Sequence, residues 1–100
     1  MSELRSKFVA WLQTFEEGAE VGIAGAGCQC PLARYYTEVE KKPSVSVAVD
    51  LITWFDTERF FKVTEPWEQF FINSIDAYGP VPITKELALN YAKHQYSEGQ

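Results

Sequence analysis

The chain has 100 residues, of which 46% are hydrophobic and 23% are charged, and its mean hydropathy is -0.21. This composition excludes a disordered tail and a membrane segment, and the length suits one domain with one hydrophobic core. We therefore predict a single domain over residues 1–100, with a frayed tail over about 96–100.

Fourteen acidic residues against nine basic ones give a formal net charge of -5. The bases are scattered, and Lys41 and Lys42 form the only adjacent pair. This pattern argues against a basic face that binds nucleic acid. The N-terminal stretch also lacks an apolar run long enough for a signal peptide or a membrane span. These features predict a cytoplasmic protein with neither a nucleic acid nor a membrane as its partner.

Apolar residues at helical spacing predict two helices in the first part of the chain. The first is expected between Ser2 and Gly18, and its inner face carries Leu4, Phe8, Trp11, Leu12 and Phe15. Pro31 suits the first position of a short second helix. The apolar residues that repeat in this second helix are Leu32, Tyr35, Tyr36 and Val39.

The clearest strand pattern runs over residues 44–51. Every second residue in it is apolar and is expected to face inward, namely Val45, Val47, Val49 and Leu51. A turn over residues 56–58 and a return strand over residues 59–63 follow. The sequence thus predicts an antiparallel hairpin over about residues 44–63.

Two more helices are expected after this hairpin. Thr64 and Pro66 predict the start of one that ends before Gly79, with an inner face formed by Trp67, Phe70, Phe71, Ile75 and Tyr78. Thr84 begins a last helix over residues 85 to about 94. The element order α-α-β-β-α-α indicates an α+β fold, in which a small antiparallel hairpin is covered by about four helices.

The two cysteines, Cys28 and Cys30, lie one residue apart directly before the helix start at Pro31. Because a helix N-terminus favours a thiolate, the pair is a candidate redox switch. The alternative is that both are small apolar residues packed under the second helix. A metal site is less favoured, because His94 lies far from the thiols and the paired spacing of zinc sites is missing.

Three glycines precede the cysteines, in the pattern GxxGxG formed by Gly22, Gly25 and Gly27. A dinucleotide fingerprint instead requires GxGxxG between a strand and a helix. We therefore interpret these glycines as positions that allow tight turns between two helices, and we predict no cofactor.

Aromatic residues are crowded between positions 54 and 71. Neighbours on a strand point to opposite faces, so one of each adjacent aromatic pair faces away from the core unless helices cover both faces. Exposed aromatic residues are typical of protein interfaces. The interface candidates are Trp54, Phe55, Phe60, Phe61 and Trp67, and the alternative is a core packed on both sides.

The stretch from Cys30 to Tyr35 reads CPLARY, and a strand pair and the helix start at Pro66 follow it. Over about residues 22–78 the chain resembles short uncharacterised bacterial proteins with a CPLARYL-like motif. The resemblance implies this order of elements and no activity. Arg34, the polar residue of the motif, is a candidate contact for an anion at the helix start, and the alternative is an ion pair with Glu38.

These observations together predict a small protein-interaction module without enzymatic activity. It is expected to self-associate, or to dock on a protein partner, through its exposed aromatic residues. The alternative function is a thiol redox switch at Cys28 and Cys30, and a metal-binding protein is the least favoured of the three.

Overall fold

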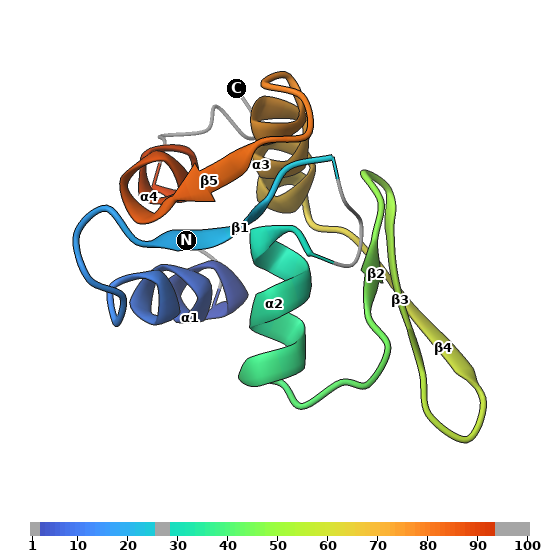
Figure 1. Cartoon of the computed structure of the whole chain (residues 1–100). Helices are drawn as coiled ribbons and strands as arrows, with labels where there is room; N and C mark the ends of the chain where they lie inside the picture. The colour runs from blue at the N-terminus through green and yellow to red at the C-terminus, as the bar shows by residue number, and fades with distance from the viewer. Residues whose placement is uncertain (1–2, 26–28, 94–100) are drawn as a thin grey trace.

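The structure is a computed structural model that describes residues 3–25 and 29–93. Within these residues it is an α+β fold with four helices and two antiparallel sheets. The helices are α1 (Glu3–Leu12), α2 (Pro31–Glu38), α3 (Pro66–Asp76) and α4 (Lys85–Ala92). The strands are β1 (Glu20–Ile23), β2 (Ser46–Val47), β3 (Leu51–Phe55), β4 (Arg59–Val63) and β5 (Pro82–Thr84). Figure 1 shows that the helices and the β1–β5 pair form one body, with β2, β3 and β4 standing along one side of it.

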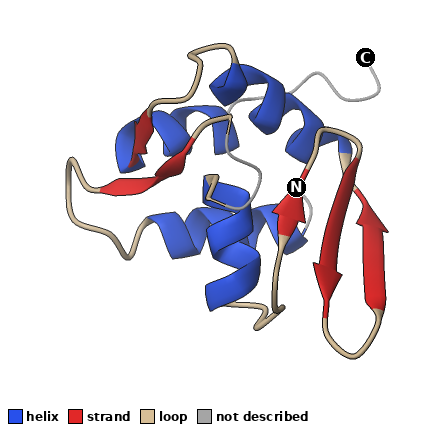
Figure 2. Cartoon of the chain, turned by 45° about the vertical axis from the view of Figure 1, so that its right-hand side comes forward, coloured by secondary structure: helices blue, strands red, loops and turns tan. Residues whose placement is uncertain are grey.

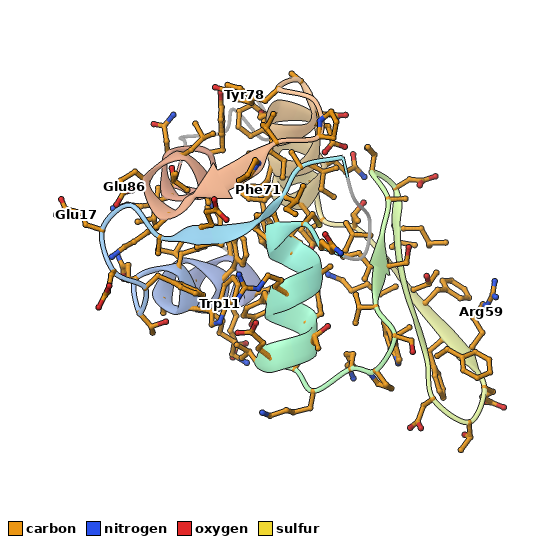
Figure 3. The ribbon with its side chains drawn as sticks, viewed as in Figure 1. Trp11, Glu17, Arg59, Phe71, Tyr78 and Glu86 are labelled. Atoms are coloured by element: carbon orange, nitrogen blue, oxygen red, sulfur yellow. The ribbon has the colours of Figure 1, made fainter. Side chains whose placement is uncertain are left out.

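The helical inner faces meet in an aromatic core centred on Phe8 of α1. Its ring centroid lies 5.1 Å from that of Phe71 on α3 and 5.6 Å from those of Tyr35 on α2 and Trp67 on α3. Phe8, Tyr35 and Phe71 have no exposed surface, and Figure 3 places Phe71 in the middle of the body. Aromatic pairs of this kind stabilise a fold beyond the area that they bury. One cluster therefore holds three helices together, on faces that the periodicity had predicted. Val39 and Tyr78 were expected on these faces too, but both are exposed, because they lie at or beyond the C-terminal ends of α2 and α3.

The sheet formed by β1 and β5 is not among the predicted elements. β1 pairs antiparallel with β5, which lies far along the chain, so no local pattern marks the pairing. A Cβ added to Gly22 would lie 2.5 Å from the Pro31 nitrogen and 2.8 Å from the Gln29 carbonyl oxygen. Gly22 is therefore a site of close approach between β1 and the backbone before α2, whereas the sequence analysis interpreted it as a turn.

The strand expected over residues 44–51 is in fact interrupted. It contributes β2 and the start of β3, which pair antiparallel with each other. Between them the Ala48 N–H donates to the Leu51 carbonyl at 2.9 Å and closes a tight turn. Val45 and Val47 are buried as expected, but Val49 lies in this turn and is exposed. Leu51, which was also expected to face inward, is only half-buried and lies opposite the exposed Val63. The predicted hairpin is thus a three-stranded sheet in the order β2-β3-β4, shown as the right-hand strands of Figure 2.

Candidate interaction surface

The hairpin formed by β3 and β4 has one apolar face turned away from the body, called here the outer face. Phe55, Phe61 and Val63 on this face expose 52%, 65% and 67% of their surface, more than any other large hydrophobic residue in the described ranges. Because opposite residues of an antiparallel pair lie on the same face, the register defines its members. The outer face consists of Leu51 opposite Val63, Thr53 opposite Phe61 and Phe55 opposite Arg59.

The inner face of the hairpin packs against the body. It carries Trp54 opposite Phe60 and Ile52 opposite Lys62. The Trp54 and Phe60 rings are stacked with centroids 5.9 Å apart, and the Lys42 Nζ lies 4.8 Å from the centroid of Trp54. The prediction that one residue of each adjacent aromatic pair faces away from the core is therefore confirmed: Phe55 and Phe61 face outward. Their neighbours Trp54 and Phe60 are on the opposite face, where Phe60 is still 37% exposed.

A buried polar cluster fastens this inner face to the helices. The Lys62 Nζ on β4 donates to Glu68 Oε1 at 2.8 Å and to the Tyr36 hydroxyl at 2.7 Å. The Tyr36 hydroxyl in turn donates to Glu68 Oε2 at 2.7 Å. Burial, followed by the neighbouring Glu68 carboxylate, raises the pKa of Tyr36 well above its ordinary value of about 10, so the hydroxyl keeps its proton. The cluster joins β4, α2 and α3 at one point.

The start of α3 places Glu68 in this cluster. Glu65 is the N-cap, and its backbone N–H donates to Glu68 Oε1 at 2.8 Å in a capping box. The N-cap of α3 is therefore Glu65, one residue after Thr64, where the sequence had predicted the start of the helix. Trp67 donates its indole N–H to Glu65 and is only 4% exposed. This interface candidate lies in the core and adds nothing to the outer face.

A pocket of about 410 Å³ opens between the inner face of the hairpin, α1 and the segment after α2. Tyr36 and Trp54 line it together with six charged side chains, which are Glu3, Lys7, Glu40, Lys42, Lys62 and Glu65. Three of these carry each sign, and several are already engaged, as in the Glu3–Lys7 pair at 3.7 Å. The balanced charges select neither an anion nor a cation by net charge, so the pocket alone defines no ligand class.

Sequence analysis missed Lys62, Glu68 and Tyr36 as a group. Two sequence patterns concern these residues. Lys62 alternates with residues of β4 that face outward, which indicates an inward side chain, and Glu68 follows Glu65 by three residues, which is the spacing of a capping box. Neither signal reveals that the two side chains meet, because that contact depends on how the hairpin docks against α3.

Of the other candidate residues, the structure describes Cys30 and Arg34, and neither is part of the hairpin. Cys30 is 5% exposed and caps α2, where its Sγ accepts from the Ala33 N–H at 3.5 Å. Cys28 and His94 fall outside the described residues, so the proposed thiol pair is not seen together. Arg34 forms the expected ion pair with Glu38 at 3.1 Å and also donates to the Glu20 carbonyl. Its contact with an anion stays a prediction.

Comparison with known proteins finds no matching family model, curated protein or solved structure. The resemblance to proteins with a CPLARYL-like motif therefore stays a prediction.

In residues 3–25 and 29–93, no three His, Cys, Asp or Glu side chains cluster in a way that could hold a metal ion. Within the same ranges, every helix is too short or too polar to cross a membrane.

Proposed function

We propose that this protein is a self-associating interaction module whose contact surface is the outer face of the β3–β4 hairpin. The observation that carries the proposal is the exposure of Phe55, Phe61 and Val63 on one side of a hairpin whose other side is fastened by buried groups. Apolar side chains gathered on a well-anchored surface are typical of protein interfaces, since little order is lost when they bind.

The charge distribution favours a second copy of the chain as the partner. The hairpin contains two acids and two bases, namely Asp56, Glu58, Arg59 and Lys62, so it is neutral in a chain of net charge -5. Two copies that meet through other acidic parts of their surface repel each other, whereas two hairpins meet without that penalty.

The expected strength follows from the area still exposed. Complete burial of a Phe or Val side chain contributes about 1.5–3 kcal/mol, and more than half of each of the three side chains is available. Each therefore contributes about 1 kcal/mol or slightly more when a partner covers it. A substitution removes the side chain from both copies of a homodimer and therefore costs about 2 kcal/mol or slightly more. Because about 1.4 kcal/mol corresponds to a factor of ten in affinity, the substitution weakens association about thirtyfold or more.

Sedimentation velocity over a concentration series tests the proposal. We expect reversible association that Phe61→Ser and Val63→Ser each weaken while circular dichroism stays unchanged. Val39→Ser is the matched control, because Val39 is 42% exposed but lies at the end of α2, away from the hairpin. A protein that stays monomeric up to about millimolar concentration, or one that the Val39 substitution weakens equally, would refute the proposal.

A further inference from the structure

The hydrogen-bond pattern of the hairpin defines which backbone groups of β4 point outward. At one end of the ladder the Thr64 N–H donates to the Asp50 carbonyl, and at the other the Asp56 N–H donates to that of Glu58. Hydrogen-bonded and non-hydrogen-bonded pairs alternate along an antiparallel ladder. Counting inward from either end along the register of β3 with β4 gives the same result. Ile52–Lys62 and Trp54–Phe60 are hydrogen-bonded pairs, and the pairs that alternate with them are not.

The remaining residues of β4, Arg59, Phe61 and Val63, consequently turn their backbone N–H and C=O groups away from β3. β4 is an edge strand of its sheet, and Figures 1 and 2 both show it as the described element farthest from the body. Figure 3 shows the Arg59 side chain reaching outward from this rim. The side chains of the same three residues are exposed. Every second residue of β4 therefore has both an exposed side chain and backbone groups without a partner strand in the described part of the chain.

We propose that two copies of the chain pair through their β4 strands, antiparallel, with Phe61 on the two-fold axis. This inference rests on the proposed self-association and places the contact at the β4 edge of the outer face. Phe61 and Val63 then meet the second copy, whereas Phe55 on β3 lies one strand back from the seam. Phe61 then lies opposite Phe61 of the second copy, and Arg59 lies opposite Val63 in both directions. Each of these three pairs is a hydrogen-bonded one and exchanges two backbone hydrogen bonds, so the two sheets become one continuous sheet.

The side chains are compatible with this arrangement. On the outer face the opposite pairs are aromatic with aromatic and Arg59 with Val63, so like charges do not oppose each other. An inward lysine often protects an edge strand from pairing, and Lys62 is such a residue. Its ammonium group is, however, held by Glu68 within the same chain, at 2.8 Å. Its charge therefore does not oppose the approach of a second strand.

Amide hydrogen exchange measured residue by residue with NMR tests this geometry. In the monomer the Phe60 and Lys62 amides are protected by β3, whereas those of Arg59, Phe61 and Val63 exchange rapidly. Above the dissociation constant found by sedimentation, we expect these three amides to slow at least tenfold. A dimer in which they stay fast overturns strand pairing but leaves the self-association intact. A protein that never associates overturns both.

A backbone substitution provides an independent test. Val63→Pro removes an outward N–H and places a ring against the partner strand, but it leaves the bonds to β3 in place. Val63→Ala is the matched control, because it shortens the same exposed side chain and keeps the N–H. We expect the proline variant to dimerise at least tenfold more weakly than the alanine variant, with unchanged protection of Phe60 and Lys62. Equal dimerisation of the two variants overturns the proposed pairing.

Discussion

The strongest prediction for stability concerns the ion pair that fastens the hairpin to α3. Lys62→Met leaves the Glu68 carboxylate, which has no exposed surface, with Tyr36 and a backbone N–H as its partners. Removing one partner of a buried ion pair costs about 3–5 kcal/mol. The Lys62 side chain is 26% exposed, so water already weakens the attraction. We therefore expect the free energy of unfolding to fall by about 2–3 kcal/mol.

The companion variants follow from the same contacts. Glu68→Gln leaves a lysine that can turn toward water, so its cost is expected to be about 1–2 kcal/mol. The double variant Lys62→Met with Glu68→Gln carries no charge at either of these two positions. It is expected to be about 1 kcal/mol more stable than Lys62→Met alone. Lys7→Met is the control, because Lys7 forms only an exposed pair with Glu3, and its effect stays within about 0.5 kcal/mol.

Urea denaturation at pH 7, followed by tryptophan fluorescence, measures these differences. Exchange of the hairpin amides shows in addition whether the hairpin loosens before the rest of the chain unfolds. The reasoning fails if Lys62→Met costs less than the Lys7→Met control, or if the double variant is no more stable than the single lysine variant.

Three further predictions concern the body of the protein. Gly22→Ala is expected to lower the free energy of unfolding by about 1–3 kcal/mol in urea denaturation, because its Cβ would meet backbone at 2.5–2.8 Å; an unchanged stability would contradict this packing. Burial raises the pKa of Tyr35 and Tyr36 above the unfolded value of about 10, so the stability from their protonated forms is complete below pH 10 and decreases above it. Absorbance at 295 nm should show about two fewer tyrosines ionised at pH 11 in the native protein than in urea, and equal numbers would contradict the burial. In a Cys28→Ser variant, the 5% exposed Cys30 is expected to react with a disulfide reagent at least tenfold more slowly when folded than in urea; a fast reaction would instead favour the thiol switch.

Local patterns in the sequence were sufficient for the helices and for the two sides of the hairpin. The inner face of α1 with Phe8 and Leu12, and that of α3 with Phe71 and Ile75, follow from the helical period, which needs only neighbouring residues. The opposite orientations of Phe60 and Phe61 follow in the same way from the period of a strand.

Only the tertiary structure decided which contacts form between segments that are distant in the chain. The β1–β5 pairing and the close approach at Gly22 join parts of the chain that share no local pattern. The alternation of apolar residues over 44–51 looked like one continuous strand. The hydrogen bond from the Ala48 N–H to the Leu51 carbonyl closes a turn there and ends β2. The meeting of Lys62 with Glu68, and the greater exposure of one hairpin face, depend on where the hairpin docks. Those features place Phe61 at an open edge, and the proposed function depends on them.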